Sequence, residues 1–142
     1  MPGAARPSPG GVRRDRVSLV LDAGALIAYE RGSRTVQAFL ERAYRQSEEV
    51  RTSTAVVAQA WHGEPRQARL ATLLRGVDER DLTSGQARTV GRLLRRAGTA
   101  DVVDGALIDI ANDGDEILTS DPMDIHALAM TAGKTLIITL VS

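Results

Sequence analysis

The sequence predicts an α/β domain of three layers, an α/β/α sandwich in which helices cover both faces of a central parallel sheet. Short apolar, β-rich runs alternate along the chain with segments whose apolar residues follow helical spacing. This alternation is typical of a parallel sheet, because parallel strands need long, usually helical, crossover connections. The length of 142 residues suits one domain, and 43% hydrophobic with 25% charged residues is close to the globular average.

Each element follows from its own spacing and end signals. Strands are predicted at residues 17–22, 50–53, 77–82, 116–119 and 135–140. Helices are predicted at residues 23–30, from 33 or 34 to at least 43, and at 55–62, 66–75, 84–97, 101–111 and 122–131. The hydroxyls expected to cap three of these helices are those of Thr54, of Thr83 or Ser84, and of Thr99.

The chain divides into an N-terminal arm at residues 1–15 and one domain at residues 16–142. The arm is rich in Pro, Gly and Arg and has no apolar period, so we expect it to be disordered. The arginines of the arm either contact nucleic acid or only help to keep the chain in solution.

Composition excludes several classes of protein. The chain has no cysteine, which excludes a disulfide scaffold, a zinc finger, an iron–sulfur protein and a thiol nucleophile. Two histidines, His62 and His126, are too few for most zinc enzymes. The apolar stretch 17–28 is interrupted by Asp22 and is too short for a membrane span. We expect a cytoplasmic protein that does not enter the membrane.

The net charge of zero hides an uneven distribution. Residues 1–100 carry a balance of +7, and residues 101–142 carry a balance of −7. The split suggests a basic surface for a polyanion beside an acidic pocket for cations, although surface charges can also fall unevenly without function.

Carboxylates follow two of the predicted strands. Asp22 ends the first strand, and Asp121 follows the strand at residues 116–119. If the two strands are parallel, both side chains lie at the edge of the sheet where ligands bind in such folds. Asp101 and Asp104 are three residues apart at a helix start, and Asp124 lies one helical turn after Asp121. Each could instead cap a helix or be a solvated charge.

Several carboxylates without cysteine favour a hard, oxygen-binding ion such as Mg²⁺ or Mn²⁺. Such an ion activates water and stabilises charge in phosphodiester hydrolysis. One face of the helix predicted at residues 84–97 carries the arginines that could follow a phosphate backbone or simply be solvated: Arg88, Arg92, Arg95 and Arg96.

Three segments together resemble the acidic signature of a PIN domain: LVLDAGALIAY, ADVVDGALIDIA and ILTSDPMDIHALA. More narrowly, residues 17–142 resemble VapC-type toxins, the ribonuclease half of type II toxin–antitoxin pairs. The resemblance implies an α/β/α sandwich, an endoribonuclease dependent on Mg²⁺ or Mn²⁺, a homodimer and a cognate antitoxin.

The resemblance also implies roles for individual residues. Asp22, Asp104 and Asp121 match the catalytic metal ligands, and Asp101 and Asp124 would be further acidic contacts with the metal. Thr119 matches a hydroxyl that hydrogen-bonds near the metal. Where the family usually has a glutamate, in the helix after the second strand, this chain has Gln59. The amide brings no charge, so this departure leaves open a weakened nuclease.

Three functions remain in competition. The first is metal-dependent RNA hydrolysis, with Gln59 and Thr119 supporting the acids. The second is a catalytically weakened module of the same fold that binds RNA or an antitoxin. The third is a phosphoacceptor receiver domain, although its paired acids would follow the first strand rather than lie on a late helix. Lys134 and Asp115 are predicted to be solvated charges.

Overall fold

The computed structural model describes residues 17–142, so the arm predicted at residues 1–15 lies outside the described residues. Five strands and seven α-helices alternate along this range. In chain order they are β1 (Ser18–Leu21), α1 (Ala23–Glu30), α2 (Arg34–Arg45), β2 (Glu49–Ser53), α3 (Thr54–Ala60), the 3₁₀ turn η2 (Pro65–Gln67), α4 (Ala68–Leu74), β3 (Asp78–Arg80), α5 (Ser84–Ala97), α6 (Val102–Ile110), β4 (Glu116–Thr119), α7 (Pro122–Ala132) and β5 (Ile137–Leu140).

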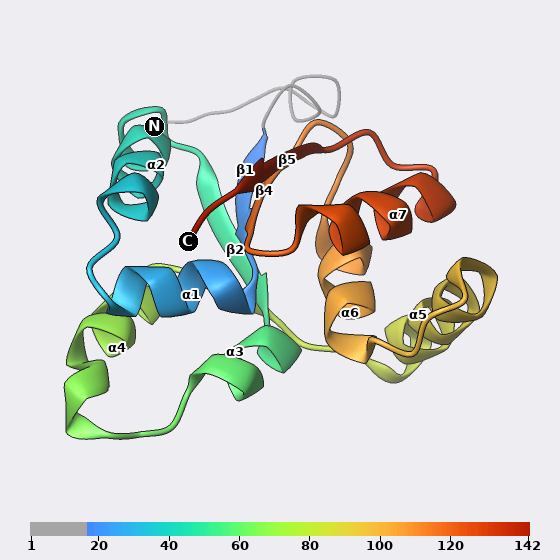
Figure 1. The fold of residues 1–142 in the computed structure, drawn as a ribbon, viewed down its shortest axis with the longest axis horizontal. Helices are drawn as coiled ribbons and strands as arrows, with labels where there is room; N and C mark the ends of the chain where they lie inside the picture. The colour runs from blue at the N-terminus through green and yellow to red at the C-terminus, as the bar shows by residue number, and fades with distance from the viewer. Residues whose placement is uncertain (1–16) are drawn as a thin grey trace.

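The five strands form one sheet in the order β3-β2-β1-β4-β5, and every neighbouring pair is parallel. Helices α1, α2 and α4 gather on one side of the sheet, and α5, α6 and α7 gather on the other (Figure 1). Helix α3 packs against α1 and α6. The three-layer α/β/α architecture predicted from the alternation of strands and helices is therefore confirmed.

The strand order rules out the receiver-domain alternative. A receiver has the flavodoxin-like order 2-1-3-4-5, in which the strand order reverses between the first and third strands. Here β2 and β3 lie on one side of β1, and β4 and β5 lie on the other. The reversal of strand order therefore falls between β1 and β4.

The core lies on both faces of the two central strands. Leu19, Val20 and Leu21 of β1 and Ile117 and Leu118 of β4 are completely buried. Continuous apolar strands of this kind are expected where helices cover both faces of a sheet. No helix in the part of the chain that the structure describes is long and apolar enough to cross a membrane.

Two helix caps differ from the prediction. Ser53, not Thr54, caps α3 by accepting a hydrogen bond from the Val56 N–H at 3.1 Å. Asp101, not Thr99, caps α6 by accepting from the Asp104 N–H at 3.0 Å. In each case a neighbouring side chain stands three residues before the free N–H, which is the spacing that a cap requires.

Candidate metal centre

The fold brings the predicted carboxylates to the point where the strand order reverses. In open parallel sheets, ligands bind beyond the carboxyl ends of the strands at this reversal. Asp22 follows β1 directly, and its N–H donates to the Leu118 carbonyl of β4 at 3.1 Å. Asp121 comes two residues after the end of β4. The two aspartates therefore share one edge of the sheet.

Asp22 is a buried carboxylate held by several donors. Its Oδ1 accepts a hydrogen bond from the Ala25 N–H at 2.8 Å, which caps α1. Burial raises the pKa of Asp22, while hydrogen bonds from the Thr119 side chain and from the Ala25, Ser120 and Gly24 backbone oppose this rise. Asp22 is thus fixed in place before any ligand arrives.

Gly24 lets the connection after β4 come close to α1. A Cβ at Gly24 would lie 2.6 Å from the Ser120 Cβ and 3.1 Å from its backbone N. Real Cβ atoms essentially never come as close as the first distance, and the second is tighter than nine in ten Cβ contacts, so glycine permits the approach without a shift of Ser120. Ser120 immediately precedes Asp121, so this close contact helps to place Asp121 beside Asp22.

Asp104 lies in the first turn of α6 and carries the most perturbed carboxyl group of the site. It is half-buried, and its pKa rises from the ordinary 3.8 to about 7. Burial is the largest cause, followed by the charge and hydrogen bond of Asp101 and the charges of Asp22 and Asp121. The charges of Asp101, Asp22 and Asp121 therefore all add to the effect of burial on the pKa of Asp104.

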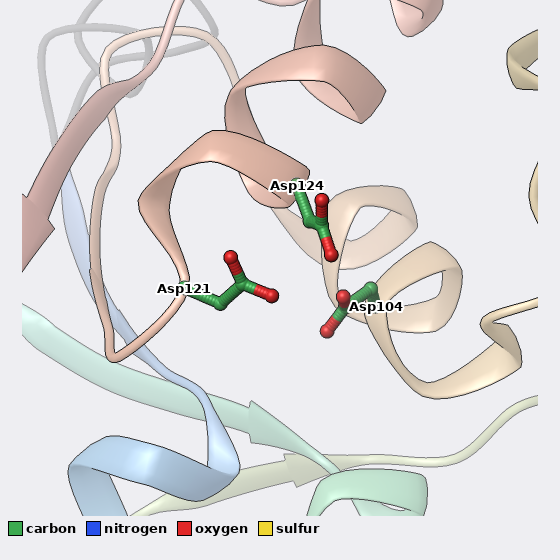
Figure 2. A group of neighbouring side chains, drawn as sticks. All are labelled: Asp104, Asp121 and Asp124. Atoms are coloured by element: carbon green, nitrogen blue, oxygen red, sulfur yellow. The ribbon is translucent and has the colours of Figure 1, made fainter.

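Asp121 and Asp124 complete the cluster from the start of α7. Asp104, Asp121 and Asp124 each offer one carboxylate oxygen, and these three oxygens lie within 4.8 Å of one another. Figure 2 shows the three side chains converging from α6 and from the start of α7. The pKa of Asp124 is raised, first by a hydrogen bond that its protonated form donates to Asp121 and then by the charge of Asp121.

This donor set fits a hard divalent cation. Carboxylate oxygens are the ligands that Mg²⁺ and Mn²⁺ prefer, and a cation would relieve the repulsion that raises the pKa of Asp104. Because Asp22 and Asp101 each already accept a capping hydrogen bond, they have less free capacity for a ligand. Asp121 makes no side-chain capping bond.

Thr119 links the two strand-end aspartates. Its side chain is fully buried, and its Oγ1 accepts a hydrogen bond from the Asp121 N–H at 2.9 Å. The same side chain hydrogen-bonds to Asp22. Thr119 therefore holds Asp22 and Asp121 in a fixed relation, as a supporting residue would.

Gln59 does not belong to the group of three carboxylates. It lies near the end of α3, and its side chain is exposed. Helix α3 has the sequence TAVVAQA and contains no acidic residue. The structure thus brings together carboxylates from α6 and α7 and from the end of β1, with none from α3.

The four predicted arginines form an exposed face of α5, which we call the arginine face (Arg88, Arg92, Arg95 and Arg96). None of them forms an ion pair with another residue of the range 17–142. Helix α5 buries Val90, Leu93 and Leu94 and packs against α6 and α7, the helices that carry the acidic cluster. The arginine face lies on the side of α5 opposite these buried residues, so it points away from α6 and α7.

Two predicted solvated charges are structural instead. Asp115 is 1% exposed and accepts hydrogen bonds from the Ser18 and Asn112 N–H groups, each at 2.8 Å. Lys134 is partly buried, and its ammonium donates to three backbone carbonyls. Both predictions were wrong because the partners lie up to 97 residues away in sequence.

Sequence reasoning also missed Gln67, which is 1% exposed. Its Oε1 accepts hydrogen bonds from the His62 and Gly63 N–H groups at 2.7 and 2.9 Å. Its Nε2 donates to Glu30 and to the Ala60 carbonyl, each at 2.8 Å. Gln67 thereby ties the end of α3 to the end of α1, and no sequence pattern marks such a contact.

A hollow of about 640 Å³ lies away from the acidic cluster. Its lining includes Glu49 and Val50 at the start of β2 and Asp78 at the start of β3. These residues belong to the amino ends of the strands, so the hollow is at the opposite edge of the sheet. The carboxylates instead lie at an edge where Asp121 and Asp124 are exposed.

The fold and the site together define a small α/β/α domain with an acidic cluster at the reversal of strand order. No family model and no curated protein matches the chain. Twelve chains of solved structures match it. One belongs to the crystal structure of VapBC2 from Rickettsia felis bound to a DNA fragment from their promoter, with 14% identity and a TM-score of 0.60. The match covers 89% of this chain and 100% of that chain, and at this identity it concerns the fold.

Proposed function

We propose that the chain is an endoribonuclease dependent on Mg²⁺ or Mn²⁺ and acts as the toxin of a toxin–antitoxin pair. The observation that carries the proposal is the convergence of Asp104, Asp121 and Asp124, with one oxygen from each inside a 4.8 Å group, next to buried Asp22. The PIN-like fold agrees with this use of the sheet edge.

In this proposal the acids hold the ion and the neighbouring groups hold the acids. Asp22, Asp104 and Asp121 are the catalytic ligands, Asp124 adds a carboxylate, and Asp101 supports Asp104 through its hydrogen bond. When bound, the divalent ion activates water and stabilises negative charge on phosphate oxygens. Thr119 keeps the strand-end acids in register through its hydrogen bonds to Asp22 and Asp121.

In this proposal the arginine face binds the RNA backbone. Four guanidinium groups on one exposed helix face attract phosphates without regard to sequence. The face belongs to a helix that packs, through its opposite side, on the two helices that carry the carboxylates. An edge at which Asp121 and Asp124 are exposed suits a polynucleotide better than a small ligand.

The proposed partners are an antitoxin protein and a second copy of the chain, in the cytoplasm. The similar structure from Rickettsia felis is described as VapBC2 bound to promoter DNA, which supports an antitoxin as a partner. The resemblance of the sequence to VapC-type toxins supports the homodimer.

The test is cleavage of structured RNAs by the purified protein with Mg²⁺, with Mn²⁺ and with excess chelator. Either ion is expected to support cleavage, and chelator is expected to stop it. Asp121→Asn should lower the rate by orders of magnitude, since the ion supplies both water activation and charge stabilisation. Asp81→Asn, at an exposed aspartate between β3 and α5, is the matched control and should cleave normally. Cleavage that persists in excess EDTA contradicts the proposal.

A weakened, RNA- or antitoxin-binding module is the second candidate, and Gln59 is the observation that favours it. Helix α3 brings no carboxylate to the site, so the centre is one charge short of the pattern that the resemblance implies. One charge at about 4 Å from a partly solvated ion is worth on the order of a few kcal/mol before desolvation. Gln59→Glu should therefore tighten Mn²⁺ binding about tenfold or more, as measured by calorimetry.

The effect of Gln59→Glu on cleavage separates the two candidates. If the native protein binds RNA without cutting it and the variant cuts, the chain is the weakened module. If both cut, the native site is a working nuclease. If the variant binds Mn²⁺ no more tightly than the native protein, Gln59 lies outside the centre, although the three-aspartate site stands.

A further inference from the structure

The ammonium of Lys134 closes the C-terminal end of α6. Its Nζ donates to the carbonyl oxygens of Ile108 at 2.7 Å, Asp109 at 3.0 Å and Ala111 at 2.7 Å. A helix end leaves its last carbonyls short of intrahelical partners, although here the Ile108 carbonyl also accepts from the Ala111 N–H at 3.3 Å. We call this set of three hydrogen bonds the Lys134 clasp.

A second basic side chain, that of Arg51, also hydrogen-bonds to this helix end. The Nη1 of buried Arg51 donates to the Ile110 carbonyl at 3.2 Å. Each carbonyl from residue 108 to residue 111 therefore accepts from a lysine or an arginine. Positive charge near a helix C-terminus also interacts favourably with the helix dipole. Lys134 and Arg51 therefore both stabilise the C-terminal end of α6.

The clasp uses the only lysine of the chain. The other 17 basic residues are arginines, so a lysine at this position stands out against the composition. An ammonium is a compact charge with three donors that can point at three converging carbonyls, whereas a guanidinium is a planar fork. Burial lowers the pKa of Lys134, and the charges of Asp109, Asp113 and Asp115 oppose that shift.

The clasp joins the two helices that carry the acidic cluster. Lys134 directly follows Gly133, the C-cap of α7, and its own N–H donates to the Ala129 carbonyl at 3.0 Å. The next residue, Thr135, is held on the loop after α6 by its N–H, which donates to Asp113 at 2.8 Å. The C-terminal ends of α6 and α7 are thus connected by the clasp.

The opposite ends of the same two helices bear the carboxylates. Asp104 lies in the first turn of α6, and Asp121 and Asp124 lie at the start of α7. One carboxylate oxygen from each of these three residues lies within 4.8 Å of the others, and like charges at this distance repel. A helix of nine residues is only about 14 Å long and stiff, so the contact at one end limits the separation at the other.

We propose that Lys134 is a positioning residue for the carboxylate cluster and sets the spacing between Asp104 on α6 and the two aspartates of α7. The proposal rests on the proposed function, because the spacing matters for a bound cation. Lys134 touches neither cation nor substrate. It acts through the backbone of α6.

The experiment compares Mn²⁺ affinity with folding stability in clasp variants. Lys134→Met keeps the length of the side chain and removes the charge and the donors. Lys134→Gln keeps two amide donors without the charge. Calorimetry with Mn²⁺ and urea unfolding are measured on both. The Mn²⁺ dissociation constant should rise about tenfold or more in Lys134→Met and less in Lys134→Gln.

Arg42→Met is the matched control. Arg42 donates to Glu116 at 2.6 Å, so its loss also costs stability, but neither residue belongs to α6 or α7. This control should unfold at lower urea and bind Mn²⁺ as the native protein does. If Lys134→Met and Lys134→Gln lose stability and still bind Mn²⁺ within twofold of the native protein, the clasp is structural only and the proposal is wrong.

A measurement on the native chain covers the case in which the variants do not fold. Because the chain has one lysine, a ¹⁵Nζ label reports on the clasp alone. Coupling between two sites is reciprocal, so Mg²⁺ binding at the cluster should slow the exchange of the Lys134 ammonium protons. Exchange that does not change while Mg²⁺ binds overturns the proposal. A native protein that binds neither ion overturns the proposed function instead.

Discussion

Asp104→Asn should stabilise the protein when no divalent ion is present. The pKa of Asp104 is raised from 3.8 to about 7 by burial and by Asp101, Asp22 and Asp121. The folded chain therefore keeps a proton on Asp104 that the unfolded chain releases near pH 4. Between these two pKa values the unfolding free energy falls as pH rises, and above about pH 7 the penalty is complete.

The expected gain follows from this difference. A pKa difference of about 3 corresponds to a ceiling of about 4 kcal/mol at about 1.4 kcal/mol for each pKa unit. Asp104 is only half-buried, so solvent screens the repulsion and we expect on the order of 1–2 kcal/mol at pH 8. Asparagine is nearly the same shape and carries no charge at any pH. The gain should be smaller at pH 5, where the native Asp104 is protonated.

Urea unfolding at pH 5 and pH 8, with chelator and then with Mn²⁺, measures the effect. A bound ion stabilises the folded state by an amount that grows with ion concentration. Mn²⁺ should thus raise the unfolding free energy of the native chain and leave that of Asp104→Asn nearly unchanged. With Mn²⁺ the native chain should therefore be the more stable of the two proteins. Asp81→Asn, at an exposed aspartate, is the control and should show neither effect. An Asp104→Asn protein that is no more stable than the native one at pH 8 refutes the reasoning.

Three further predictions concern the surroundings of the site. Gly24→Ala places a Cβ 2.6 Å from the Ser120 Cβ, so it should cost about 1–3 kcal/mol and weaken Mn²⁺ binding, and adding Ser120→Gly should restore both. Replacing the arginine face by alanines should flatten the salt dependence of RNA binding, and an unchanged slope in filter-binding assays would mean that this face meets solvent or an antitoxin. Deleting residues 1–15 should leave the melting temperature within a few degrees, since this segment has few apolar side chains to bury.

Much of the fold could be predicted because its signals are local. The strand at residues 116–119 and the helix at residues 23–30 have the predicted bounds, since each combines a clear period with a turn or charge at its ends. Thr83 caps α5 as one of the two predicted candidates, and Gln86 returns a hydrogen bond to it. The strand predicted at residues 77–82 is observed only as the three residues of β3, because only these residues pair with β2.

The shared edge of the strand-end aspartates could also be predicted, because parallel strands end at the same edge. What could not be predicted is which oxygens converge. Asp101 and Asp104 look equivalent in sequence, but Asp101 turns its carboxylate to the helix N–H and Asp104 points toward α7. The Lys134 clasp spans 23–26 residues of sequence, and no period or spacing reports such a contact.

The cluster is tolerable because every acid in it stands at the start of a helix. Asp22, Asp101 and Asp121 are the N-cap residues of α1, α6 and α7, and Asp104 and Asp124 lie in the first turns of α6 and α7. Each helix start favours a nearby negative charge by about 0.3–1 kcal/mol. The positions of these acids at helix starts therefore help the fold to tolerate their charges. The three helix starts offset part of the repulsion, and a bound cation would offset more of it. The pKa of Asp104 stays raised, chiefly by burial and then by the charges of Asp101, Asp22 and Asp121.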